Sequence, residues 1–144
     1  MKNFAFWLFL LLPVLAAAQA KVPQGTWAMH GSTSEGVVAH LKFDLTKSGL
    51  RARIVAIPPS SKLNKSTVCT TCPKADPRYK KPLHNMVVLQ GMQAAGTRWV
   101  QGDWLDVEKG FSYAANLELR SSELLILHVM YGGRTKPRKL TLVK

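Results

Sequence analysis

The chain has 144 residues, the length of a single domain, and 47% of them are hydrophobic, which is enough for a packed core and excludes a disordered chain. Twenty Lys and Arg residues stand against eight Asp and Glu, so the formal net charge is +12 and the surface is expected to attract anions. Two cysteines are too few for a disulfide scaffold.

The start of the chain has the pattern of an export signal. A basic residue, Lys2, precedes the apolar run Phe4–Leu12, and Ala18-Gln19-Ala20 fits the small-x-small cleavage pattern. We predict a signal peptide over 1–20 and one mature domain over 21–144, with cleavage before Lys21. The alternative is an uncleaved anchor, but the apolar run is short for a membrane span.

Removal of the first 20 of 144 residues leaves 124, with 19 basic and 8 acidic residues and a net charge of +11. The sequence predicts no transmembrane segment after cleavage. The expected location is the periplasm or the exterior of a bacterium, where disulfides are permitted.

The mature chain alternates apolar and polar residues with period two, which is typical of strands. A first strand over 26–30 is followed by a hairpin formed by 37–45 and 50–57. Further strands are predicted over 86–92, 98–107, 111–120, 124–131 and 140–143. About eight sequential antiparallel strands predict an all-β up-and-down barrel, with an open sandwich as the alternative. The Lys-rich connection from Pro58 to Asn85 is the one long loop, a length that is usually functional or partly disordered.

Several short motifs follow one another in an order that resembles a known family. In chain order they are Gly25-Thr26-Trp27, Cys69-Thr70-Thr71-Cys72, Lys81-Pro82-Leu83, Gly91-Met92, Trp99-Val100-Gln101-Gly102, Leu105-Asp106 with Gly110 and Tyr113, and Gly133-Arg134-Thr135. Together they resemble the bacterial exported family catalogued as domain of unknown function 2147, over nearly the whole mature chain. The resemblance implies a small exported β-barrel similar to the lipocalins, with no established activity.

The Gly-x-Trp start and a late arginine also resemble the lipocalin pattern, in which the arginine packs over the tryptophan and closes the barrel. That resemblance implies a barrel-closing pair of Trp27 and Arg134. The chain departs from the exported family at three places: His84-Asn85 after Pro-Leu, His128-Val129 in the penultimate strand, and Leu140 near the place of a closing tryptophan. The chain thus resembles a diverged member.

Cys69 and Cys72 lie three positions apart and admit three interpretations. A local disulfide is favoured in an oxidising compartment. A metal or redox site would need further ligands, or a helix after the cysteines, and neither is visible in the sequence. The third interpretation is a pair of free thiols.

The acidic residues offer one candidate constellation for catalysis. Asp106 could act with a histidine such as His40 or His128, which would make the protein an envelope enzyme. The favoured interpretation is a turn, in which Asp106 accepts backbone hydrogen bonds and Gly110 takes a positive φ. No nucleophile motif and no phosphate-binding glycine loop is present, so we predict no enzymatic activity, no cofactor and no metal.

The favoured function is a non-enzymatic binding module, with two candidate sites. The first is the barrel interior, which could hold a small hydrophobic ligand on Leu41, Phe43, Tyr113 and Leu117. The second is the basic loop, where an anionic envelope lipid or glycan could bind to Lys74, Arg78, Lys80 and Lys81. Nucleic acid is not expected as a partner, because no aromatic-spaced binding motif accompanies the charge and export removes the usual target.

Overall fold

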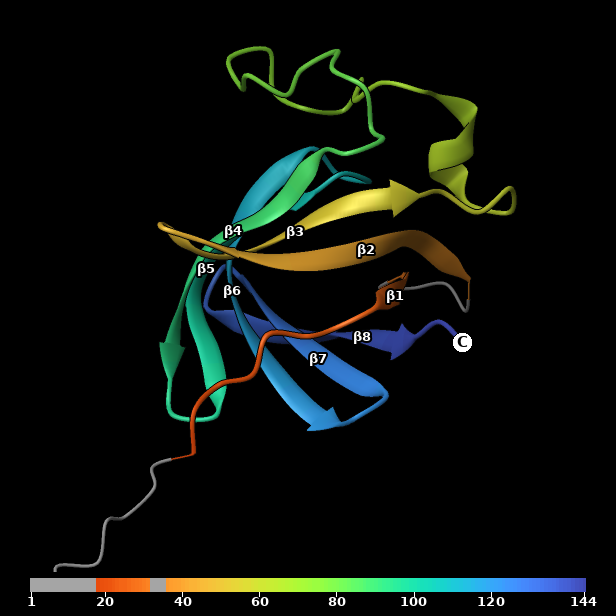
Figure 1. The fold of residues 1–144 in the computed structure, drawn as a ribbon. Coiled ribbons are helices and arrows are strands. Elements are labelled where there is room, and N and C mark those ends of the chain that lie inside the picture. The colour runs from red at the N-terminus through yellow and green to blue at the C-terminus, as the bar shows by residue number, and fades with distance from the viewer. Residues whose placement is uncertain (1–17, 32–35) are drawn as a thin grey trace, which may run out of the picture.

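The structure, a computed structural model, describes residues 18–31 and 36–144. Within these residues eight antiparallel strands close into a barrel in sequence order (Figure 1). They are β1 (Thr26–His30), β2 (Val37–Thr46), β3 (Gly49–Ala56), β4 (Val87–Ala95), β5 (Arg98–Asp106), β6 (Phe111–Ser121), β7 (Leu124–Tyr131) and β8 (Arg134–Leu142). The predicted barrel is confirmed, and the sandwich is wrong, because β1 pairs with both β2 and β8. Most of the predicted signal peptide, residues 1–17, lies outside the described residues.

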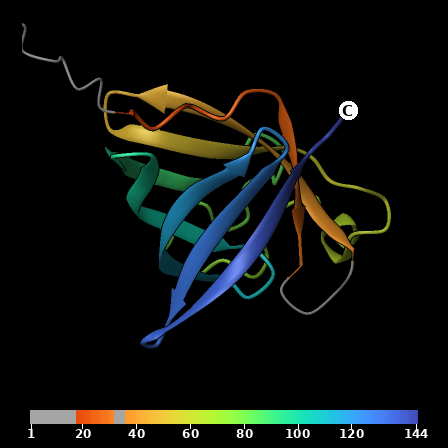
Figure 2. The same cartoon turned by 90° about the horizontal axis from the view of Figure 1, so that it is seen from below.

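The last strand begins six residues earlier than the sequence predicted. Gly132 and Gly133 have φ values of 51° and 80°, so they form a two-residue turn that leads directly from β7 into β8. Pro137, which cannot donate to a ladder, lies inside β8 opposite His128. The resulting β7–β8 hairpin projects beyond the rest of the barrel (Figure 2).

Side chains from all parts of the barrel fill its interior. Trp27, Leu41, Trp104, Leu117 and Leu125 are each 2% exposed or less. A hollow large enough for water would expose the side chains that line it. The interior around these residues is therefore a packed core, as an eight-stranded barrel permits.

The up-and-down topology sorts the connections onto two ends of the barrel. The connections β1–β2, β3–β4, β5–β6 and β7–β8 all lie at one end, because each follows an odd-numbered strand. We call this the loop end; the other, which carries both termini of the barrel, is the terminal end. The β3–β4 loop, residues 57–86, contains the short helix η1 (Lys62–Lys65) and arches over the strands (Figure 1).

Candidate functional site

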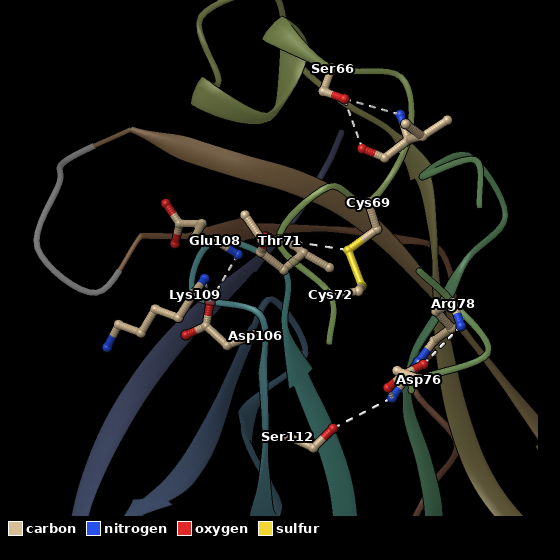
Figure 3. The surroundings of a disulfide bond; sticks show 12 residues. Ser66, Cys69, Thr71, Cys72, Asp76, Arg78, Asp106, Glu108, Lys109 and Ser112 are labelled. Atoms are coloured by element: carbon tan, nitrogen blue, oxygen red, sulfur yellow. Dashed lines mark hydrogen bonds and ion pairs between the residues drawn. A yellow bond between two sulfur atoms is a disulfide. The ribbon is translucent and has the colours of Figure 1, made fainter. Parts of the chain in front are cut away.

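The β3–β4 loop is fixed to the barrel by a disulfide-closed turn. Cys69 and Cys72 form the disulfide, with their Cα atoms 5.5 Å apart, which confirms the favoured interpretation of the pair. Figure 3 shows Thr71 inside this turn, and its hydroxyl donates to the Val107 carbonyl oxygen at 2.7 Å. Cys69, Cys72 and Val107 are 2–3% exposed, so the core continues beneath the loop.

We expect the disulfide to stabilise the loop but not to be required for folding. It closes a ring of four residues, so its entropic contribution is about 2 kcal/mol. Replacing both Cys69 and Cys72 with Ser should lower the free energy of unfolding by about that amount and leave the barrel folded. Urea denaturation followed by far-UV circular dichroism measures both. Loss of the barrel signal in the double variant would show that the loop is part of the folding unit.

Arg78 holds the same loop through an ion pair with Asp76. Its guanidinium donates to both Asp76 carboxylate oxygens at 2.8–2.9 Å, to the Val87 carbonyl at 3.2 Å and to the Ser112 hydroxyl at 3.4 Å (Figure 3). The interpretation of Arg78 as an anion-binding residue is therefore corrected: its donor groups are occupied by the protein itself. The negative charge that an external anion would bring to Arg78 already comes from Asp76.

This ion pair makes the loop sensitive to acid. The hydrogen bond from Arg78 lowers the pKa of Asp76 below its ordinary value of 3.8. A carboxylate with a lowered folded-state pKa contributes stability above its ordinary pKa and loses it as the pH falls through the folded value. Wild-type protein should thus lose more thermal stability between about pH 5 and pH 2 than Asp76→Asn. Equal losses in the two proteins would mean that the pair does not stabilise the fold.

A buried charged junction lies at the loop end, where side chains from β5 and β8 meet across the barrel. Arg138 is 2% and Asp106 is 1% exposed, and their side chains form an ion pair at 2.7 Å. A second nitrogen of Arg138 lies 3.3 Å from a Glu108 carboxylate oxygen, and the Tyr131 hydroxyl donates to Asp106 at 3.4 Å. Burial lowers the pKa of Arg138, but Asp106, Tyr131 and Glu108 together raise it by more, so the net shift is upward. This junction was not predicted from the sequence, although Arg138 alternates with the inward-facing Leu140.

Asp106 also forms the turn that the sequence predicted. Its carboxylate accepts hydrogen bonds from the backbone N–H groups of Glu108 and Lys109, at 3.1 and 3.2 Å, and Gly110 has φ +77°. The turn interpretation is confirmed. It places Lys109 at the barrel surface, where its ammonium group lies 4.7 Å from the centre of the Tyr131 ring.

The structure does not bring Asp106 together with a histidine. Its side-chain partners are Arg138, Tyr131 and backbone amides. His128 instead bonds Glu118 at 3.0 Å, and His40 alternates with the inward-facing Leu41 on β2. The constellation proposed for an enzyme is therefore not assembled in the described chain.

The implied barrel-closing pair of Trp27 and Arg134 is also wrong. Trp27 lies opposite Leu142 at the terminal end, and its indole N–H donates to the Gln24 carbonyl at 3.0 Å. Arg134 is exposed at the start of β8, opposite Tyr131. Leu142 lies eight positions after Arg134 on β8, a distance of roughly 26 Å along the strand.

The four candidate interior residues are not gathered around an open cavity. Leu41 and Leu117 are 1% exposed within the packed core. Phe43 is half-buried against that core on β2. Tyr113 lies nearer the loop end, where its ring centre is 4.3 Å from that of Tyr131.

The remaining basic residues of the loops collect at the loop end. Eight exposed cations there make no ion pair with a described acid: Lys62, Lys65, Lys74, Lys80 and Lys81 from the β3–β4 loop, Lys109 from the β5–β6 turn, and Arg134 and Lys136 from the β7–β8 hairpin. We call them the loop-end cations. Of the acids described near this end, Asp76, Asp106 and Glu108 are paired with Arg78 or Arg138, and Asp103 lies close enough to Arg78 to raise its pKa. The positive charge of this end is therefore not neutralised by those acids.

Two hollows accompany these cations. A groove of about 530 Å³ is lined by polar residues that include Arg78, Lys81 and His84 and by apolar residues that include Pro82 and Met86. A smaller pocket of about 240 Å³ lies between η1 and the disulfide turn; Lys62, Lys65, Leu63, Val107 and Glu108 are among its lining residues. Both combine apolar walls with lysines, which suits ligands that carry a negative charge.

No group of three or more potential ligands for a metal ion occurs among the described residues. The described part of the chain contains no helix that is long and apolar enough to cross a membrane.

Comparison with known proteins establishes the fold alone. No family model and no curated protein matches the chain, so membership of the exported family named above stays a prediction. Among solved structures, the chain is similar to protein HP1028 from the human pathogen Helicobacter pylori, which is described as belonging to the lipocalin family. The match has a TM-score of 0.70 and 15% sequence identity, and covers 87% of this chain and 84% of that one. The fold is lipocalin-like.

Proposed function

We propose that the protein is a non-catalytic binding module whose loop end binds an anionic component of the bacterial envelope. The observation that carries this proposal is the gathering of the loop-end cations from three separate connections onto one end of the barrel. Clustered charges on one surface raise the local potential and attract anions. Location in the periplasm or outside the cell, and membership of the exported family that the motifs resemble, are parts of the same proposal.

The loop end is favoured over the barrel interior as the binding site because the interior is already filled by packed side chains. A small apolar ligand inside the barrel would have to displace core residues such as Leu41 and Leu117, each 1% exposed. Removing core contacts of this kind costs several kcal/mol per large side chain. Binding at the loop end requires no such rearrangement, because the cations there are already exposed.

The proposal is tested with two anionic probes, inorganic polyphosphate and vesicles that contain phosphatidylglycerol. Three substitutions, Lys74→Gln, Lys80→Gln and Lys81→Gln, are made together in the mature chain. Each lysine near an anionic surface contributes about 1 kcal/mol, so the three substitutions together should lower the affinity by about 100-fold. Binding of the wild type should also weaken steeply with salt, because exposed charges are screened beyond about 10 Å at 0.1 M. Arg78 is left unchanged because it holds the loop.

A matched variant carries the same three charge changes elsewhere on the barrel. Lys42, Lys47 and Lys139 are exposed, make no ion pair with a described acid, and lie outside the loop-end connections. Replacing them with Gln should leave the affinity within a small factor of the wild type. If both triple variants lose affinity equally, or if binding ignores salt, the loop end is not the site.

A further inference from the structure

The loop end also carries an exposed aromatic ring among its cations. Phe111 begins β6, directly after the β5–β6 turn, and 60% of its surface is exposed. Burial of a phenylalanine side chain away from water is normally favourable, but in this fold most of the Phe111 side chain stays in contact with water. Lys109 lies two residues before it, and the next residue, Ser112, accepts a hydrogen bond from Arg78 of the β3–β4 loop. Phe111 therefore lies directly beside the β5–β6 turn, one residue before the contact of Ser112 with the β3–β4 loop.

The β7–β8 hairpin completes this surface on the other side. Lys109 and Lys136 both place their ammonium groups over the Tyr131 ring, at 4.7 and 5.8 Å from its centre. Met130, at the tip of β7, is 38% exposed. The loop end thus combines exposed apolar side chains with cations that no described acid pairs.

We propose that the loop end docks on an anionic lipid bilayer, with Phe111 inserted between the headgroups and the loop-end cations on their phosphates. This inference rests on the function proposed above and names its partner. The charge of the surface is complementary to acidic phospholipid, and an apolar ring gains from contact with acyl chains. A soluble anionic glycan or polyphosphate would neutralise the charge of the lysines, but it has no apolar interior into which the Phe111 ring could insert.

The test compares Phe111→Ser with Leu45→Ser in the full mature chain. Leu45 is a close match: it is 59% exposed, is the penultimate residue of a strand, and precedes Lys47 by two residues, but it lies at the terminal end of the barrel. Affinity is measured for vesicles of phosphatidylethanolamine with phosphatidylglycerol, for vesicles of phosphatidylcholine alone, and for inorganic polyphosphate. Thermal denaturation checks that both variants remain folded.

Phe111→Ser should lower affinity for the anionic vesicles by about tenfold and leave polyphosphate binding unchanged. Leu45→Ser should change neither, Phe111→Trp should restore vesicle binding, and phosphatidylcholine vesicles should bind the wild type weakly. The inference would be overturned if Phe111→Ser bound the anionic vesicles as tightly as the wild type. It would also be overturned if Phe111→Ser lost as much affinity for polyphosphate as for the vesicles, or if Leu45→Ser lost as much vesicle affinity as Phe111→Ser. Those results leave the proposed function standing, because it is tested separately by the loop-end lysine variants and by the salt dependence of binding.

Discussion

Replacement of Arg138 with Met should lower the free energy of unfolding by about 3–5 kcal/mol, a large fraction of the stability of a small domain. Met fills a similar volume but leaves Asp106 charged in a site that is 1% exposed. Two backbone N–H groups and the Tyr131 hydroxyl still bond the carboxylate, but its counter-charge is gone. Urea denaturation followed by tryptophan fluorescence measures the loss.

A second change separates the buried charge from the lost packing. The double variant Arg138→Met, Asp106→Asn removes both charges and keeps an oxygen that can accept the turn's hydrogen bonds. It should be more stable than Arg138→Met alone, because no unpaired buried charge remains. Lys139→Met, on the exposed neighbour in β8, should change stability by about 0.5 kcal/mol or less. A loss below about 1 kcal/mol for Arg138→Met would contradict the account.

Replacement of Gly110 with Ala should displace the β3–β4 loop and destabilise the protein by about 2–4 kcal/mol. Gly110 has φ +77°, which L side chains rarely adopt, and an added methyl group would overlap the Thr71 carbonyl oxygen. Relief of that overlap requires the disulfide turn to move. The Thr71–Val107 hydrogen bond would then break, and water would reach the buried Val107.

Gly96→Ala is the control for this change. Gly96 has a similar φ of +62°, but a methyl group there meets nothing within 4 Å. It should cost only the conformational penalty of a positive φ, about 1–2 kcal/mol. Limited proteolysis should cut the β3–β4 loop faster in Gly110→Ala than in Gly96→Ala. Equal stability and equal cleavage would show that the loop does not depend on its contact with the β5–β6 turn.

The strands could be predicted from the sequence because alternation is a local property. Val37–Thr46 and Phe111–Ser121 each present one apolar face, and the structure places both strands within about one residue of the predicted ends. The start of β8 was not predicted because the basic residues after Gly133 do not alternate with apolar ones, which is the pattern that identifies a strand. What makes that segment a strand is its pairing with β7, which is a non-local property.

The candidate site was predictable only in part. The loop lysines were identified correctly as exposed charges, but the occupation of Arg78 by Asp76 depends on the folded shape of the loop. The burial of Arg138 follows from its alternation with Leu140 once the bounds of β8 are known. Whether the barrel is filled depends on how side chains of different strands fit together, and no pattern along the chain reports that fit.

The most direct test of binding at the loop end is a nuclear magnetic resonance titration of the isotope-labelled mature protein with lipid nanodiscs that contain phosphatidylglycerol. We predict that the backbone amide signals of Lys74, Lys81, Lys109 and Lys136 shift or broaden with increasing lipid, while those of the core residue Leu117 do not. Changes that centre on Leu117 and its neighbours in the barrel interior, or on the terminal-end connections, would contradict the proposed site.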